Sequence, residues 1–383
     1  MAGNGAALAG VAPADDRFAH WPRARARLVL ALVAVFLVMS ALVPITSGPH
    51  KSPAPAPAAS SAPAKAAKPQ RDEDLALYDR IIARISHGEN YYAVATDEQR
   101  RGDYPVRPGL AVRLPTLAYL LAWLGTPGQI LAALALLAGV LVVWWRRMSE
   151  EPGGLAVRNI AVALVFVGAS QGLNRYYYVM HELWSGMLLA LAFGLHRPTR
   201  AKWLGAFVVA ALALAIREHC LPFVLLMAAY AFWRRAWKEG AAWACLVLVF
   251  LAALALHVHM VEQYTLPGDR FSSSWVALRG LSGWLSLIVL PSTLHYLLHW
   301  VAGPIVIAML LGWAGWKSPA GEFGTLLYLG YGVLFMVVGR ANNFYWGAVV
   351  APAMFIGLAF APRAFLSLVQ AAGVGTRPST SAG

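Results

Sequence analysis

Residues 72–92 read DEDLALYDRIIARISHGENYY, and the rest of the chain is arranged around this stretch. It opens with three adjacent carboxylates, and its apolar residues Leu77, Ile81 and Ile85 recur four positions apart. Side chains at that spacing share one face of a helix. The pattern predicts a short amphipathic helix over residues 74–87, ended by the glycine that follows. A second polar stretch, 92–101, predicts another short helix.

Apolar runs dominate the remainder of the sequence. The chain has 383 residues, of which 59% are hydrophobic and 13% charged. About 20 apolar residues are needed to cross the hydrocarbon core as a helix, and runs of roughly that length recur throughout. We therefore expect an all-α, polytopic transmembrane helical bundle of about ten spans. The expected spans are 28–45, 129–145, 157–171, 177–195, 203–216, 220–233, 241–258, 300–316, 322–339 and 345–361.

The formal net charge of +13 raises the question of nucleic acid. The basic residues, however, cluster at the ends of the apolar runs, which is typical of the positive-inside pattern of membrane proteins. Anionic headgroups are a sufficient partner for these charges, so we expect membrane lipids and no nucleic acid as partners. The two cysteines, Cys220 and Cys245, lie in apolar segments and are interpreted as packing residues.

The distribution of basic residues predicts how the chain is oriented. Arg23, Arg25 and Arg27 precede the first apolar run and place the N-terminus in the cytoplasm. The basic groups from Arg146 onward are all cytoplasmic if residues 109–124 enter the membrane and return. If 109–124 cross fully, the groups from Arg146 to Lys238 lie outside instead. We favour the re-entrant or interfacial alternative, with both termini inside.

This topology gives a multi-pass protein of the inner (plasma) membrane with its site facing the periplasm or exterior. Residues 274–298, broken by glycines and a proline, are expected to form a second segment on the outer surface. The expected division is 1–26 cytoplasmic tail, 27–46 first transmembrane helix, 47–71 external Pro/Ala-rich linker, 72–128 external catalytic-loop region with amphipathic helices and the re-entrant segment, 129–362 transmembrane bundle, and 363–383 cytoplasmic tail.

Polar residues at the outer ends of the spans are the main indication of function. Charges at the cytoplasmic ends are basic anchors, whereas the outer ends carry mixed acids, bases, amides and aromatics. Charged residues near or within spans are rare and are usually paired or functional. The sets are Arg113, His181-Glu182, Arg217-Glu218-His219, and Arg340 to Trp346 with Asn343 and Tyr345. His257-x-His259 lacks an evident third ligand, so we expect no essential metal and no cofactor.

Each set has a structural alternative. One interpretation of the acidic cluster is that its carboxylates stabilise a helix N-terminus through the helix dipole. The other is that one of Asp72, Glu73 and Asp74 is a general base. Arg217 bounds two helices, or its planar guanidinium binds a lipid-linked phosphate. The 340–346 segment is an aromatic belt with a snorkelling arginine, or a sugar and phosphate site. The residues alone leave these alternatives open.

One part of the sequence resembles a known family. Asp74 and Tyr78, followed by Gly88, Tyr91-Tyr92 and Arg113-Leu114-Pro115, resemble the first external loop of GT-C membrane glycosyltransferases of the mannosyltransferase type. The likeness covers about residues 75–125, and Thr116 departs from it by replacing a second proline. The resemblance implies a polyprenyl-phosphate-linked sugar as donor and an acidic loop residue as base. Spacing to Tyr78 favours Asp74, with Asp72 and Glu73 as fallbacks.

The expected function is therefore transfer of a sugar, with inversion, to a lipid or glycan acceptor on the external face. External arginines would stabilise the leaving phosphate. The expected substrate-binding residues are Tyr78, Arg113, His181, Glu182, Arg217, Glu218, His219, Arg340, Asn343 and Tyr345. A transporter or flippase of an anionic lipid or small solute is the alternative, and a surface-glycan polymerase or ligase is a third possibility.

Overall fold

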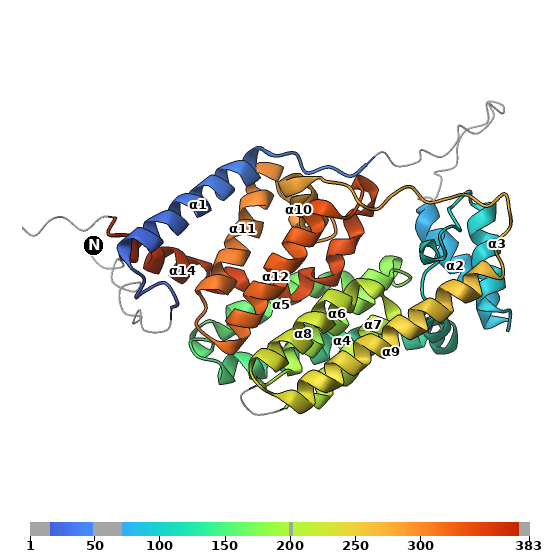
Figure 1. The fold of residues 1–383 in the computed structure, drawn as a ribbon, viewed down its shortest axis with the longest axis horizontal. Helices are drawn as coiled ribbons and strands as arrows, with labels where there is room; N and C mark the ends of the chain where they lie inside the picture. The colour runs from blue at the N-terminus through green and yellow to red at the C-terminus, as the bar shows by residue number, and fades with distance from the viewer. Residues whose placement is uncertain (1–15, 49–70, 199–201, 375–383) are drawn as a thin grey trace, which may run out of the picture.

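The computed structural model describes residues 16–48, 71–198 and 202–374, and over these ranges the chain is helical without a β-strand. Most of the helices pack into one bundle, and a smaller group lies at one end of it, on the right in Figure 1. The predicted Pro/Ala-rich linker falls almost entirely outside the described residues.

The smaller group is called the external unit here, after its predicted location, and contains the two predicted amphipathic helices. They are α2 (Glu73–Ser86) and α3 (Tyr91–Arg101), so both predictions are confirmed to within a residue or so. Leu77, Ile81 and Ile85 are buried, as their spacing predicts, and pack with residues of α3 and with Val261. Val261 lies near the end of the long helix α9 (Trp237–Glu262), which reaches from the bundle to this unit (Figure 1).

The bundle contains the apolar helices. In chain order it is built from α1 (Arg23–Leu42), α4 (Thr116–Glu150), α5 (Arg158–Ala169), α6 (His181–Leu195), α7 (Leu204–Ile216), α8 (Leu221–Trp233), α9, α10 (Gly280–Val289), α11 (His299–Gly315), α12 (Pro319–Val337), α13 (Ala351–Met354) and α14 (Gly357–Ala372). Short 3₁₀ turns connect several of them: η2 (Gly109–Ala111), η3 (Leu155–Val157), η4 (Ser170–Leu173), η5 (Arg175–Tyr177), η7 (Glu218–Cys220), η8 (Thr293–Tyr296) and η9 (Ala341–Val349).

Six helical stretches of the described chain are long and apolar enough to cross a membrane: Arg23–Leu42, Gly109–Glu150, Leu155–Leu173, Trp237–Glu262, Pro319–Val337 and Ala351–Ala372. Large apolar side chains on them face outward, for example Leu28 at 62% and Leu248 at 68% exposure, as helices in contact with lipid require. The chain is thus a helical, multi-pass membrane protein. The number of ten spans stays a prediction, because α6, α7, α8 and α11 have only 13–17 residues, about 20–26 Å.

A break at Gly125 divides α4 into two parts. Gly125 has φ +60°, a backbone conformation that glycine adopts without strain, and Pro127 follows it. The part before the break, 116–124, is about 13 Å long, less than half of the hydrocarbon core. Its residue Ala118 belongs to the core of the external unit. These dimensions agree with a segment that does not cross by itself.

Three predictions are wrong in detail. The segment 274–298 does not lie wholly on the surface, because Gly283–Val289 of α10 are buried in the bundle. The last span is not 345–361: residues 341–349 form η9, and helix runs on to Ala372, beyond the expected start of the tail at 363. The η9 segment packs closely against α10, and an added Cβ at Gly347 would lie 1.6 Å from the carbonyl oxygen of Leu287.

The predicted N-terminal tail is also partly ordered by packing. Phe18 is 2% exposed and lies against α11, α14 and α1. Asp16 accepts hydrogen bonds from the Ser367 hydroxyl and the Phe18 amide, at 2.5 and 2.8 Å. Residues 16–22 therefore belong to the folded protein, and residues 1–15 lie outside the described chain.

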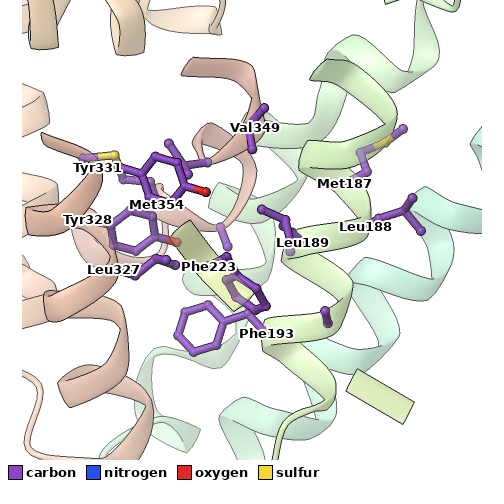
Figure 2. Close-up of a cluster of buried hydrophobic side chains, with 14 of the residues drawn as sticks. Met187, Leu188, Leu189, Phe193, Phe223, Leu327, Tyr328, Tyr331, Val349 and Met354 are labelled. Atoms are coloured by element: carbon purple, nitrogen blue, oxygen red, sulfur yellow. The ribbon is translucent and has the colours of Figure 1, made fainter. Parts of the chain in front are cut away.

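The centre of the bundle is closely packed. Figure 2 shows Leu189 of α6 pointing toward Tyr328 of α12, with Phe193 and Phe223 in the same apolar layer. Glycines permit the closest approaches: a Cβ on Gly186 would lie 2.1 Å from the carbonyl oxygen of Ala348. This contact fixes η9 against the first turns of α6, and so positions the polar residues that both elements carry.

Candidate functional site

A cluster of buried charges lies where the bundle meets the external unit. Arg113 precedes α4, Glu182 is in the first turn of α6, and Arg217 follows α7. The Arg217 side chain is 1% exposed and that of Glu182 is 3% exposed. Charges removed from water to this extent are costly unless they are paired, and they mark functional sites in membrane proteins.

Arg113 connects the bundle to the external unit. Its Nε donates to the Tyr78 hydroxyl of α2 at 3.1 Å, and its Nη2 donates to the Tyr345 hydroxyl of η9, also at 3.1 Å. Its nearest carboxylate oxygen belongs to Glu182, at 3.8 Å. Burial raises the pKa of the Tyr78 hydroxyl, so this group keeps its proton while it accepts from Arg113. The hydrogen bonds of the Arg113 guanidinium thus go to neutral hydroxyl groups, and its nearest carboxylate is farther away.

Arg217 is held differently, between two carboxylates. Its Nε lies 2.7 Å from a Glu182 oxygen, and its Nη1 pairs with Glu218. Two negative groups therefore compensate its charge at close range, in contrast to Arg113. Arg217, Arg340 and Arg113 were all candidates for the phosphate ligand, and these contacts make Arg113 more available than Arg217.

The Arg340 segment supplies a second available cation. The backbone N–H and Nε of Arg340 donate to the Asn343 Oδ1 at 3.1 and 3.3 Å, and the Asn343 amide lies 3.4 Å from the Tyr345 hydroxyl. Tyr345 in turn accepts from Arg113. Within the described chain, no carboxylate lies within 4 Å of Arg340. The chain Arg340–Asn343–Tyr345–Arg113 therefore brings together residues separated by more than 200 positions.

The two histidines of the predicted site lie beside this chain. The His181 ring packs edge-on against Tyr78, with centroids 5.4 Å apart, and is 4% exposed. The His219 ring lies against Trp346, with centroids 4.2 Å apart. The carbonyl of His219 accepts a hydrogen bond from the Tyr331 hydroxyl at 2.7 Å. All ten predicted binding residues therefore lie in one connected cluster.

The acidic cluster is at the exposed start of α2, one turn from Tyr78. Asp72 caps the helix, since its side chain accepts from the Asp74 amide at 3.0 Å, which is the structural role considered for it. Glu73 is exposed in the first turn. Asp74 accepts a hydrogen bond from the Tyr104 hydroxyl at 2.5 Å.

Tyr104 is a site residue that the sequence reasoning missed. Its only local signal is its place in a short turn after α3, and nothing in that pattern indicates contact with α2. Burial, together with the bond to Asp74, raises the pKa of the Tyr104 hydroxyl. The hydroxyl is therefore a constant donor that orients the Asp74 carboxylate.

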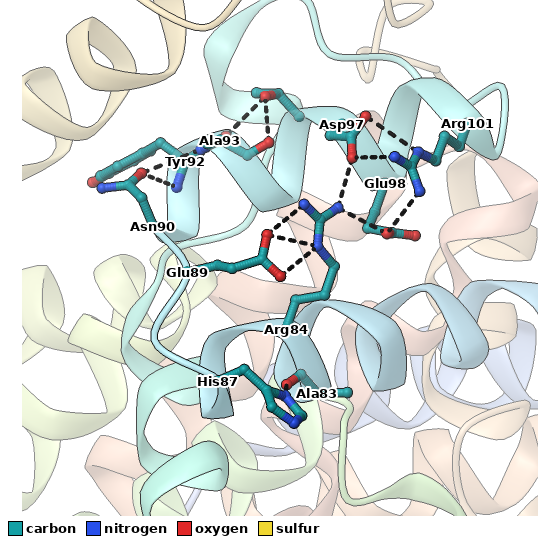
Figure 3. A network of polar contacts seen from close by, with 11 residues as sticks. Ala83, Arg84, His87, Glu89, Asn90, Tyr92, Ala93, Asp97, Glu98 and Arg101 are labelled. Carbon is teal, nitrogen blue, oxygen red and sulfur yellow. Dashed lines mark hydrogen bonds and ion pairs between the residues drawn. The ribbon is translucent and has the colours of Figure 1, made fainter.

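Ion pairs hold the external unit together. In Figure 3, Arg84 of α2 lies among Glu89, Asp97 and Glu98, at 2.6–3.0 Å from each. The hydrogen bond from Arg84 keeps the pKa of Asp97 below its usual value. Asp269, whose side chain is 1% exposed, accepts from Arg100 at 2.6 Å, and this bond likewise lowers its pKa.

A separate set of polar contacts lies at the other end of the bundle. Arg147 at the end of α4 pairs with Glu151 at 3.2 Å, and Arg197 after α6 pairs with Glu150 at 2.6 Å. His196 lies 2.7 Å from Glu239 at the start of α9. Because α4 and α6 begin at the site and end here, the predicted anchors and the predicted site occupy opposite ends.

The space beside the site is small. A cavity of about 10 Å³ is lined by Tyr78, Tyr91 and His181 and by apolar residues of α2 and α4. It holds about one water molecule, so a sugar ring enters it only if side chains or the external unit move. Among the described residues, no group of three or more His, Cys, Asp or Glu side chains is arranged to hold a metal ion.

Fold and site together define a multi-pass helical membrane protein with a buried, arginine-containing site at one end. Comparison with protein-family models, curated proteins and solved structures finds no match. The resemblance to GT-C enzymes therefore rests on the loop residues alone.

Proposed function

We propose that this protein is an integral-membrane glycosyltransferase that uses a polyprenyl-phosphate-linked sugar. The acceptor is a hydroxyl of a lipid or glycan, and the site faces the periplasm or exterior of the plasma membrane. The observation that carries the proposal is the pairing of two incompletely compensated arginines, Arg113 and Arg340, with a carboxylate-bearing helix, α2, that contacts one of them through Tyr78.

The arginines suit the leaving phosphate. A guanidinium presents a planar fork of N–H groups that matches two phosphate oxygens. Arg113 and Arg340 are joined through Asn343 and Tyr345, and the amide and hydroxyl add neutral hydrogen-bonding groups between the two cations. Preorganised donors of this kind stabilise charge that develops on the leaving group.

Asp74 suits the role of general base. It is on the same face of α2 as Tyr78, four residues earlier, or about 6 Å along the helix. Its carboxylate is exposed and oriented by Tyr104. In the proposed step the acceptor hydroxyl gives its proton to Asp74, and its oxygen forms a bond to the anomeric carbon. The bond from that carbon to the phosphate oxygen breaks, the phosphate keeps the electron pair, and the configuration inverts.

The test uses purified protein in vesicles made with a membrane lipid extract as acceptor. Polyprenyl phosphates that carry radiolabelled mannose, glucose or arabinose serve as donors. Wild-type protein is expected to transfer label from one of them, and Asp74→Asn is expected to abolish transfer while its thermal unfolding is unchanged.

Asp79→Asn is the matched control on the same helix. Asp79 pairs with Arg71, and its side chain is 43% exposed. This variant is expected to keep wild-type transfer. Full activity of Asp74→Asn would refute the assignment of the base. A reporter fused after Arg147 tests the orientation and is expected to be cytoplasmic.

A further inference from the structure

Several buried polar atoms around the site have no hydrogen-bond partner among the described residues. They include Nε2 of His181, Nη2 of Arg217, Nδ1 of His219 and Nε1 of Trp346. Leaving a buried polar group without a partner is unfavourable, so such groups are rare in folded proteins and require an explanation. Here these four occur in one neighbourhood, together with Nε of Arg217 and Oε1 of Glu182, which lie 2.7 Å apart in an ion pair.

These atoms belong to residues that are linked by contacts or by short steps along the chain. The His219 and Trp346 rings lie 4.2 Å apart, and Arg217 is two residues before His219. Arg217 pairs with Glu182, whose neighbour in α6 is His181. Trp346 directly follows Tyr345, which bonds to Arg113. The unpartnered groups thus border the proposed phosphate site on the bundle side.

Their chemistry specifies what they bind. The Trp346 indole and the Arg217 guanidinium can only donate, and each histidine nitrogen can donate in one of its protonation states. The occupant must therefore offer several acceptor oxygens. The Trp346 ring also offers an aromatic surface for the apolar edge of a compact ring. Trp346 is 6% exposed, Arg217 1% and His181 4%, so an occupant larger than a water molecule enters only if side chains or the external unit move.

We infer that Arg217, His219, Trp346 and His181 form the subsite for the transferred sugar, separate from the phosphate site at Arg113 and Arg340. This inference rests on the proposed function, because it assumes a polyprenyl-phosphate sugar as ligand. It assigns Arg217 to sugar oxygens, and it gives Trp346 a binding role.

The two sources of acceptor oxygens, sugar and phosphate, are distinguished by using two ligands. Purified protein is titrated with a polyprenyl-phosphate sugar that it uses and with the same polyprenyl phosphate without sugar. Affinity and thermal unfolding are measured in both cases. Wild-type protein is expected to bind the sugar-bearing lipid more tightly.

The decisive variant is Trp346→Phe, which keeps a ring and removes the unpartnered N–H. Its affinity for the sugar-bearing lipid is expected to fall about three- to tenfold, the usual effect of one neutral hydrogen bond, with the bare lipid unaffected. Its ligand-free unfolding temperature is expected to fall modestly, because the smaller ring packs less fully against His219 although no hydrogen bond within the protein is lost. His219→Phe is likewise expected to weaken binding of the sugar-bearing lipid but not of the bare lipid. It replaces Trp346→Phe in the test if that variant folds poorly.

Trp313→Phe is the matched control. The Trp313 indole donates to the carbonyl of Met354 at 3.0 Å, so this variant is expected to unfold at a lower temperature but to keep its preference for the sugar-bearing lipid. Unchanged selectivity in both Trp346→Phe and His219→Phe would overturn the inference and assign these atoms to buried water. Equal weakening of both ligands by Trp346→Phe would also overturn it. Failure of wild-type protein to bind either lipid would instead refute the proposed function, and the inference with it.

Discussion

Replacing Arg113 by lysine tests the proposed phosphate site while keeping the positive charge. Arg113 uses Nε for Tyr78 and Nη2 for Tyr345, so its fork joins α2 to η9. A single ammonium group lacks the planar geometry to hold both hydroxyls and a phosphate oxygen at once. Arg113→Lys is therefore expected to lose one or two charge-assisted hydrogen bonds in the transition state.

The size of the effect follows from these contacts. A hydrogen bond to a charged group contributes about 1.5–3 kcal/mol, so losing one or two of them removes about 1.5–6 kcal/mol of transition-state stabilisation. At about 1.4 kcal/mol for each factor of ten, kcat/KM should fall at least about tenfold. Arg80→Lys is the control, because Arg80 lies on α2, pairs with Glu98 at 2.8 Å and is 48% exposed.

The assay is sugar transfer from the polyprenyl-phosphate donor in vesicles, with thermal unfolding measured in parallel. Arg80→Lys is expected to stay within about twofold of wild type, because lysine keeps the positive charge beside Glu98 and Arg80 lies outside the proposed site. A folded Arg113→Lys protein with wild-type kcat/KM would refute the reasoning, because the fork geometry would then be irrelevant to the reaction.

Two further predictions concern stability. The folded-state pKa values of Asp97 and Asp269 lie below their unfolded values, so their contribution to the free energy of unfolding is complete above about pH 4 and is lost as the pH falls through the folded-state values. Hydrogen exchange of the external unit should therefore accelerate in acid before that of the bundle. Uniform acceleration would contradict this prediction. Gly347→Ala would place a Cβ 1.6 Å from the Leu287 carbonyl oxygen and should prevent normal folding. Gly330→Ala is the control, because an added Cβ there has no atom within 4 Å, and it should unfold like wild type in a thermal melt. Equal melting of the two variants would contradict the close packing at Gly347.

Local patterns account for the parts of the fold that were predictable. The helix at 73–86 follows from the four-residue spacing of Leu77, Ile81 and Ile85 and from a capping aspartate, all of which act within a few turns. The apolar runs likewise locate most helices of the bundle, because the lipid environment requires continuous apolar helices.

The errors have a different origin, in contacts between distant segments. The η9 segment at the start of the expected last span packs against Leu287, sixty residues away, and no local pattern contains that contact. The burial of α10 likewise depends on distant segments. The hydrogen bond from Tyr104 to Asp74 was missed for the same reason, because the two residues are 30 positions apart in the sequence.

The candidate site was predictable as a set of residues but not as an arrangement. Charged residues at span ends are conspicuous in a sequence with so few charges. Which arginine is compensated depends on Glu182, which lies 2.7 Å from Arg217 and 3.8 Å from Arg113. That difference favours Arg113 over Arg217 among the predicted phosphate ligands, and it arises only from how α6 packs.

The most direct measurement of the central claim is the fate of a doubly labelled donor, with one label in the sugar and another in the lipid. In vesicles that contain the purified protein and acceptor lipids, the account predicts that the sugar label moves to the acceptor, that free polyprenyl phosphate accumulates, and that Asp74→Asn prevents both. An intact donor that only redistributes between the two leaflets would contradict the account and establish a flippase.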